Sequence, residues 1–318
     1  MITMQSRHEG AMLGLAVGDA LGWPVEFMSL DAIRERHGPE RLFDLVPCGS
    51  HRAGTFTDDT QMSLAIARAI LSQGRDAEAA FITEVANEFV AWSRSPENNR
   101  APGRTCMAAC RELARDLAWR APGRNDSKGC GTAMRTAPIG LAWHGDEDRI
   151  ARMAAETSAL THGHPAAIAG GVATALLVHW ALDAVEPPGM LRRLVDRTRT
   201  ISDEFVATIE QVPGVLDCEP ESAYAVLGDA WVADEAIACA LYAFWRSPDD
   251  YRSTVVTAVN MNGDSDSVGC IAGAISGAYN GVEAIPAPWR RTVDQADQLL
   301  DVARRLLDFA THREYHHS

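Results

Sequence analysis

Basic residues are scarce in this sequence. Its 318 residues include 29 Lys and Arg against 43 Asp and Glu, which gives a formal net charge of −14 at pH 7. An acidic surface repels phosphate backbones and anionic lipid headgroups at long range. Nucleic acids and membrane surfaces are therefore poor candidate partners, although a local pocket could still bind one phosphorylated ligand.

The sequence also lacks an ordered cysteine pattern, the pattern of a signal peptide and an apolar run of membrane-spanning length. The seven cysteines are irregularly spaced and form no CxxC or Cys/His zinc pattern. We therefore expect reduced thiols in a cytoplasmic protein. Residues 1–10 lack the apolar run of a signal peptide. Because no apolar stretch reaches about 18 residues without polar breaks, no membrane span is predicted.

Alternation of polar and apolar residues, which is typical of half-buried strands, is rare. Apolar residues recur instead at intervals of three and four, which indicates helices. The clearest such segments are 61–73, 78–93, 166–182, 233–245 and 294–309. Because no shift in composition marks a boundary, we expect one all-α, compact multi-helix domain over 1–318. Within it, 37–56 is predicted to be irregular and 313–318 to be a frayed tail.

Glycines recur at every fourth position in two segments. The two series are Gly10, Gly14, Gly18 and Gly22, and Gly269, Gly273, Gly277 and Gly281. Residues four apart share one face of a helix, yet each interior glycine costs about 1 kcal/mol relative to alanine. Close packing of two central helices would justify that cost. A ligand or metal site at the ends of those helices is compatible with such packing.

Two acidic clusters directly precede predicted helices. They are Thr57-Asp58-Asp59-Thr60 and Asn262-Gly263-Asp264-Ser265-Asp266-Ser267. Either cluster alone fits helix capping, because Asp, Ser and Thr are common caps and the helix dipole favours an acid. Together they offer more oxygen atoms than capping needs, and Mg²⁺ or Mn²⁺ takes about six oxygen ligands. If folding joins the clusters, they could hold two metal ions side by side.

Asp19 and Glu26, two acids near the first glycine series, lie in different surroundings. Asp19 lies in an otherwise apolar helical segment, where a structural cap or ion pair is the favoured interpretation. Glu26 follows Pro24, which ends the helix. Glu26 is therefore better placed than Asp19 to reach a ligand.

Two turns provide weaker signals. Gly129 and Gly131 precede a helical segment, where exposed backbone N–H groups suit a phosphate, although plain turn chemistry explains them equally simply. Cys130 lies between them without an assignable His or Asn partner, so a nucleophilic role is disfavoured. His162 and His164 precede an apolar helix. There, a capping turn with one functional histidine is favoured over a metal-binding pair.

Taken together, the motifs resemble the ADP-ribosylglycohydrolases. The resemblance rests on five segments in the family's order: GAMLGLAVGDALGWPVEF (10–27), GTFTDDTQMSLAIA (54–67), GCGTAMRTAPIGL (129–141), THGHPAAIAGG (161–171) and NGDSDSVGCIAGAISGAYNG (262–281). It implies an all-α domain with a dinuclear Mg²⁺ or Mn²⁺ centre. The implied activity is cleavage of ADP-ribose from an adduct, with ADP-ribosyl-arginine on a protein as the expected substrate.

The resemblance also implies roles for individual residues. The implied metal ligands come from both acidic clusters: Thr57, Asp58, Asp59, Asp264, Asp266 and Ser267. Glu26 matches a glutamate on the family's mobile flap and is the preferred acid–base group of a catalytic centre that includes Asp58 and Asp59. The implied ADP-ribose contacts are Arg104, Gly129, Cys130, Gly131, His162 and Trp231.

Four positions depart from the family pattern. Ser267 replaces a threonine but keeps a hydroxyl, and Cys130 lies where a Gly-Asn-Gly loop is common. Arg104 lies near a family asparagine, and Trp231 replaces a tyrosine. The metal centre is thus retained, whereas the substrate-facing residues have changed. Alternatives are a hydrolase for a serine, acetyl-ester or nucleobase adduct, a two-metal nucleotide phosphohydrolase, or a non-catalytic ADP-ribose-binding protein.

Overall fold

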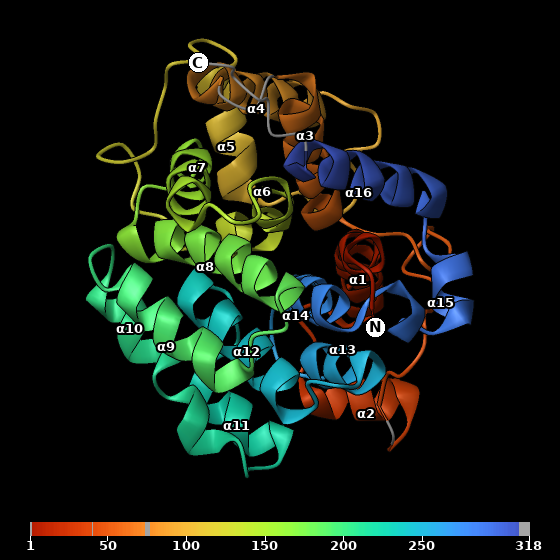
Figure 1. Ribbon diagram of the computed structural model, residues 1–318. Helices are drawn as coiled ribbons and strands as arrows, with labels where there is room; N and C mark the ends of the chain where they lie inside the picture. The colour runs from red at the N-terminus through yellow and green to blue at the C-terminus, as the bar shows by residue number, and fades with distance from the viewer. Residues whose placement is uncertain (1, 40, 74–76, 312–318) are drawn as a thin grey trace.

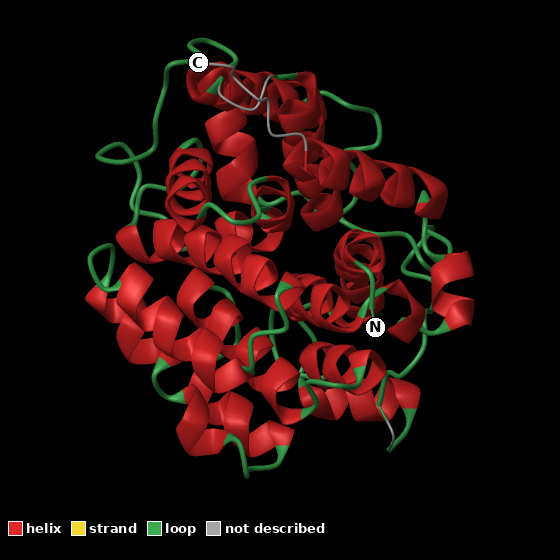
Figure 2. Cartoon of the chain, in the orientation of Figure 1, coloured by secondary structure: helices red, strands yellow, loops and turns green. Residues whose placement is uncertain are grey.

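The chain folds into helices joined by loops, with no strand among the described residues (Figures 1 and 2). The computed structural model describes residues 2–39, 41–73 and 77–311, so the predicted frayed tail at 313–318 lies outside the described residues. The all-α prediction is confirmed.

The α-helices, in chain order, are α1 (Met4–Gly22), α2 (Leu30–His37), α3 (Asp58–Ser72), α4 (Glu78–Ser93), α5 (Arg104–Leu113), α6 (Ala137–Ala142), α7 (Glu147–Ala159), α8 (Pro165–Leu182), α9 (Pro187–Thr198), α10 (Asp203–Ile209), α11 (Pro220–Leu227), α12 (Ala233–Arg246), α13 (Tyr251–Val259), α14 (Ser265–Asn280), α15 (Ala287–Thr292) and α16 (Ala296–Thr311). Short 3₁₀ helices are η1 (Trp23–Val25), η2 (Cys130–Arg135), η3 (Val212–Val215) and η4 (Val282–Ala284).

All five segments predicted from apolar periodicity form helices. They correspond to α3, α4, α8, α12 and α16, with ends moved by a few residues. The shift at α3 matters for the site, because the helix begins at Asp58 rather than at residue 61. Thr57 is its N-cap, and the Thr57 hydroxyl accepts a hydrogen bond from Asp59 N at 3.3 Å. The two aspartates therefore lie in the first helical turn.

The two glycine series form the contact between α1 and α14, which lie together in the middle of the molecule (Figure 1). A Cβ added to Gly18 would collide with the carbonyl oxygen of Gly269, and one added to Gly14 with that of Gly273. At the end of the series, Gly22 faces the backbone of Asp266. The prediction of close packing between two central helices is confirmed. This packing brings the end of α1 against the start of α14.

Helix α8 is the most apolar long helix of the fold. By length and composition alone it could cross a membrane, although no membrane span was predicted from the sequence. In the structure, 89% of that segment is buried inside the protein. It packs against α6, α7, α12 and α14 (Figure 1). Its apolar character is therefore that of a core helix.

The region predicted to be irregular, 37–56, begins one residue too early, because His37 is the last residue of α2. Its other described residues lie between α2 and α3 and form no helix. It is anchored by Asn260, whose side chain accepts from Leu42 N at 2.9 Å and donates to Leu42 O at 2.7 Å.

All seven cysteines are free thiols, in line with the expected reduced state.

Candidate active site

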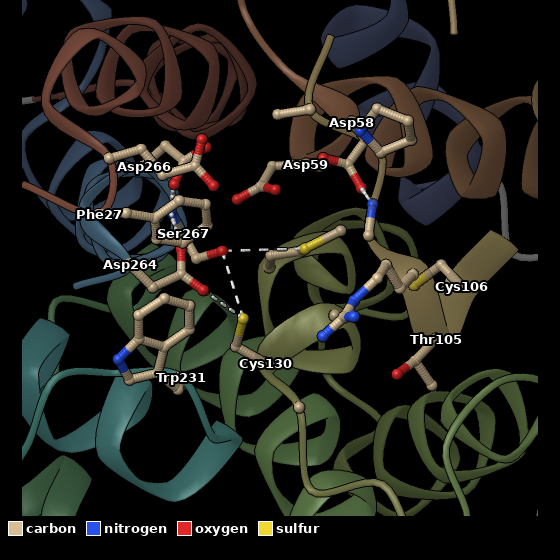
Figure 3. A pocket seen from close by; sticks show the side chains of 18 of the residues that line it. Phe27, Asp58, Asp59, Thr105, Cys106, Cys130, Trp231, Asp264, Asp266 and Ser267 are labelled. Atoms are coloured by element: carbon tan, nitrogen blue, oxygen red, sulfur yellow. Dashed lines mark hydrogen bonds between the residues drawn. The ribbon is translucent and has the colours of Figure 1, made fainter. Parts of the chain in front are cut away.

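The two acidic clusters, far apart in sequence, line one pocket of about 560 Å³ (Figure 3). Its lining residues are Glu26, Phe27, Asp58, Asp59, Ala101, Pro102, Gly103, Arg104, Thr105, Cys106, Gly129, Cys130, Gly131, Met134, His162, Trp231, Asp264, Asp266 and Ser267. All residues predicted for the site belong to this lining except Thr57. The buried Thr57 side chain instead caps α3 behind the two aspartates.

Asp19 holds the first cluster in place, as its predicted structural role requires. Its Oδ1 accepts from Thr57 N at 2.8 Å, and its Oδ2 accepts from Thr60 N at 3.0 Å and from the Thr60 hydroxyl at 2.6 Å. The carboxylate thus pairs with N–H groups that a helix start leaves unbonded. Asp19 is fully buried and does not line the pocket, so it positions the cluster rather than a ligand.

The first cluster presents two carboxylates to the pocket. Asp58 Oδ2 accepts a hydrogen bond from Gly103 N at 3.0 Å, which ties the cluster to the start of α5. Asp59 Oδ2 is buried and has no hydrogen-bond partner. A buried carboxylate oxygen without a partner is costly unless a cation or donor meets it. The donor set therefore fits a bound cation.

The second cluster begins α14. Asp264 is its N-cap, and Asp266 Oδ1 accepts from Ser267 N at 3.1 Å. Asp264 Oδ2 accepts a hydrogen bond from the Cys130 thiol at 2.7 Å, and Cys130 Sγ also lies 3.5 Å from Ser267 Oγ. Figure 3 shows Cys130, Ser267 and both aspartates on the same side of the pocket. Cys130 thus contacts the second acidic cluster, and burial raises the pKa of its thiol well above the usual range.

Glu26 joins the second cluster across the α1–α14 contact. Carboxylate oxygens of Glu26, Asp264 and Asp266 lie within 4.8 Å of one another. The backbone after Glu26 is tied to the same cluster, because Phe27 N donates to Gly263 O at 2.7 Å. Three acids this close repel one another unless they bind protons or a cation.

The carboxyl pKa values reflect this crowding. Burial, reinforced by the charges of Asp264, Asp58 and Asp19, raises the pKa of Glu26 to about 8. Burial likewise raises the pKa of Asp58 to about 8, and it raises the pKa values of Asp59 and Asp266 well above the usual range. Arg104 is the single cationic residue in the described lining. A divalent cation would supply the missing positive charge.

His162 lines the pocket beside the loop that contains Gly129 and Gly131. Its Nδ1 is 2.8 Å from the Thr161 hydroxyl, which itself accepts from Arg135 Nη2 at 2.7 Å. The Thr161 hydroxyl thus links the imidazole to the buried guanidinium of Arg135. Burial and the Arg135 charge lower the pKa of His162 to about 3, which keeps the ring neutral. A Cβ on Gly129 would lie 3.2 Å from Nε2, so these glycines give the loop close access to the ring.

An aromatic pair borders the opening of the pocket. The rings of Phe27 and Trp231 are stacked with centroids 4.7 Å apart and planes 7° apart (Figure 3). Both side chains are exposed, at 57% and 51% respectively. Phe27 was not singled out in the sequence, although its position directly after Glu26 was an available signal. Its positive φ of 62° is unusual for a bulky residue and turns the backbone sharply there.

Other lining residues carried no signal in the sequence. Gly103 donates to an acid through its backbone, and Thr105 lies 3.2 Å from the Ser127 hydroxyl. Cys106 lies 3.6 Å from Arg135 Nη1 beneath the pocket.

The predicted capping turn before α8 does form, because His164 Nδ1 accepts from Ala166 N at the start of the helix. His164 does not line the pocket.

Comparison with known proteins identifies the family. The family model described as ADP-ribosylglycohydrolase matches residues 1–315. The chain belongs to the ADP-ribosylglycohydrolase family. The family resemblance seen in the motifs is therefore confirmed, and with it the prediction that the protein is an enzyme of the ADP-ribosyl hydrolase class.

Relatives of this glycohydrolase match it over most of their own length. The ADP-ribosyl-[dinitrogen reductase] glycohydrolase of Rhodospirillum rubrum is 29% identical over 95% of this chain and 98% of that protein. The ADP-ribosylarginine hydrolase Tri1 of Pseudomonas putida is 28% identical over 96% of this chain and 78% of that protein. A solved structure described as an ADP-ribosylglycohydrolase-related protein complex is 28% identical with a TM-score of 0.77, covering 96% of this chain and 99% of that one.

Proposed function

We propose that this glycohydrolase uses two divalent cations, Mg²⁺ or Mn²⁺, to hydrolyse the bond between ADP-ribose and an arginine side chain of a modified protein. The observation that carries the proposal is the meeting of two acidic clusters in one pocket, with an unpartnered buried oxygen on Asp59. The arginine acceptor is supported by the similarity to Tri1 of Pseudomonas putida, which is named as an ADP-ribosylarginine hydrolase.

The cation-binding residues would be the four pocket aspartates, with hydroxyl groups nearby. Asp58 and Asp59 approach from α3, and Asp264 and Asp266 approach from the start of α14. The Ser267 hydroxyl lines the pocket beside Asp264 and Asp266. Thr57 does not line the pocket, so its hydroxyl would support Asp59 as the N-cap of α3. When bound, the cations supply Lewis-acid activation and neutralise the crowded carboxylates.

Glu26 is the proposed acid–base group. In the hydrolysis, the ribose C1″–nitrogen bond breaks and a bond from C1″ to the water oxygen forms. Glu26 accepts a proton from the attacking water, and the departing guanidine nitrogen gains one. A carboxylate that directly binds a cation is a poor base because the positive charge lowers its pKa. Glu26 lies beside the aspartates on a separate loop, so it suits proton transfer better than they do.

The opposite side of the pocket would hold ADP-ribose. His162 Nε2 would form a hydrogen bond with the sugar, and the 129–131 loop can approach closely because its glycines lack side chains. Trp231 offers an exposed ring face for stacking. Arg104 at the start of α5 adds a positive charge for the pyrophosphate. In this proposal the sugar would lie between the histidine and the acids.

A second acceptor class is favoured by one observation. The residues that face the substrate differ from the family pattern at Cys130, Arg104 and Trp231, while the acidic clusters are kept. A serine, acetyl-ester or nucleobase adduct is therefore the alternative substrate, and ADP-ribose binding without turnover is the non-catalytic alternative.

The deciding experiment compares ADP-ribosylated arginine, serine, acetyl-ester and nucleobase substrates, with and without Mg²⁺ or Mn²⁺, and identifies products by mass spectrometry. Intact ADP-ribose released fastest from arginine, and only with added cation, is the expected result. AMP plus ribose phosphate would identify a phosphohydrolase instead. An unchanged rate after chelation would remove the two-cation proposal.

A further inference from the structure

A second group of metal-ligating side chains lies at the C-terminal end of α8. His179 belongs to the last turn of α8, Asp183 is the residue after the helix, and His144 lies in the turn between α6 and α7. One ligand atom from each residue lies within 4.8 Å of the others. None of them lines the acidic pocket. The 18 residues of α8 span about 27 Å and separate this group from the turn that holds His162.

The geometry combines a buried ligand with two accessible ones. His144 Nε2 lies 2.9 Å from Asp183 Oδ1, and the His144 and His179 rings are 5.0 Å apart at their centroids. The side chains of His144 and Asp183 are 25% and 47% exposed, whereas that of His179 is 4% exposed. An ion can therefore approach from solvent and meet His179 at the inner side of the group.

The inner histidine lacks hydrogen bonds. Nδ1 of His179 is buried without a partner. Its Nε2 lies 3.9 Å from Glu147 Oε1, which is too long for a hydrogen bond. Glu147 is also engaged elsewhere, since it accepts from Trp180 Nε1 at 2.8 Å and from Arg197 Nη2 at 2.6 Å. A buried imidazole with no partner calls for a ligand that the protein side chains do not supply.

We propose that His144, His179 and Asp183 form a second metal site, distinct from the active site, for Zn²⁺ or a similar first-row ion. Two imidazole nitrogens with one carboxylate suit zinc, nickel or copper, whereas Mg²⁺ and Mn²⁺ prefer oxygen ligands. Ligands around a tetrahedral zinc are separated by roughly 3.3 Å. Side-chain rotation of the surface residues His144 and Asp183 can close the group to that spacing, leaving the fourth position to water.

The site would clamp the α6–α7 turn to the end of α8. These segments are separate in sequence but packed together, as Figure 1 shows for α6, α7 and α8. Trp143 and Trp180 each adjoin one of the histidines. Two of the eight tryptophans therefore lie beside the group, and binding of a quenching ion such as Co²⁺ or Ni²⁺ should lower their share of the emission.

The test uses a full-length background with two other metal-binding regions removed. His312, His316 and His317 in the tail are changed to Ala, and Asp264 and Asp266 are changed to Asn. Titration with Zn²⁺ is followed by calorimetry and thermal unfolding, and titration with Co²⁺ is followed by tryptophan emission and visible absorption. We expect one equivalent of Zn²⁺, a higher melting temperature, and the strong visible bands of four-coordinate Co²⁺.

Surface variants make the test independent of core damage. His144→Ala and Asp183→Ala should each weaken Zn²⁺ binding at least tenfold, and together they should abolish it. His37→Ala and Asp196→Ala are matched controls outside the group and should leave binding unchanged. His179→Asn should also abolish binding. Unchanged Zn²⁺ affinity in both surface variants, or no binding in the starting background, would overturn the proposal.

Discussion

The acidic floor of the pocket and its rim are held in different ways. The acidic floor, defined as Asp58, Asp59, Asp264 and Asp266, is buried at the starts of two packed helices. The pocket rim, defined as Phe27, Arg104 and Trp231, is exposed on loops or at a helix start. Packing of helix backbones positions the floor, whereas the rim consists of exposed side chains, two of which stack on each other. Changes at the floor should therefore affect chemistry or folding, and changes at the rim should affect substrate affinity.

The largest effect is expected from neutralising the floor. Asp264→Asn combined with Asp266→Asn should lower turnover at least about 10³-fold. The change removes two negative charges that would attract the cations and replaces carboxylate oxygens with weaker amide ligands. We expect Mg²⁺ or Mn²⁺ to raise the melting temperature of the unaltered protein, and the variant should lose that shift. Steady-state kinetics and thermal unfolding with added cation provide the measurements. Retention of both properties would contradict the assignment of these aspartates.

The next largest effect is expected at the helix contact beneath the floor. Gly18→Val should destabilise the fold by at least about 3 kcal/mol, because the added side chain meets the backbone of Gly269 and cannot be avoided by a side-chain rotation. Denaturant unfolding measures the change. Gly214→Ala is the control, since a Cβ there meets nothing within 4 Å, and its stability should stay within about 0.5 kcal/mol. Equal effects in the two variants would refute the close-packing argument.

A smaller effect is expected from Glu26, which lies between floor and rim. Glu26→Gln keeps the side-chain shape but removes proton transfer, so turnover should fall about 10²-fold. The cation-dependent thermal shift should persist, because the four aspartates are unchanged. Full turnover at saturating cation would exclude Glu26 as the acid–base group, and loss of the thermal shift would indicate a role in cation binding.

The smallest effect is expected at the rim. Trp231→Ala should raise KM by up to about tenfold and change kcat less than twofold, because the exposed ring provides stacking rather than chemistry. Val226→Ala, at another exposed apolar position outside the pocket, should change neither constant. A large loss of kcat in Trp231→Ala would show that the rim also orders the reacting groups.

Sequence patterns predicted the floor better than the rim. Helix starts confine Asp58 and Asp264 to known positions, and glycine spacing indicated which two helices meet. Phe27 was missed because no periodicity or motif indicates that a loop residue will stack on a ring 204 positions later, at Trp231. The position of Thr57 behind the pocket was also not apparent, since a cap and a ligand share the same sequence pattern.

The proposed second metal site shows the same difference between local patterns and long-range contacts. His179 and Asp183 are four residues apart, a spacing that places them on one side of a helix end. His144 joins them only because the α6–α7 turn packs against α8, and no sequence pattern indicates that contact. Local propensities and periodicity act within a few turns of chain. Contacts between distant segments depend on the packing of the whole core, and the paired glycine series is the one such contact that a sequence pattern indicated here.

The sequence by itself determined the helical class, the approximate positions of the acid-bearing helices and the glycine faces, because these follow from interactions among neighbouring residues. Tertiary structure alone decided that Glu26 faces Asp264 and Asp266, that Asp59 keeps an unpartnered oxygen, and that two aromatic rings border the opening. The reason is that burial and long-range packing set the electrostatic environment of a side chain, and both arise only when distant helices are brought together.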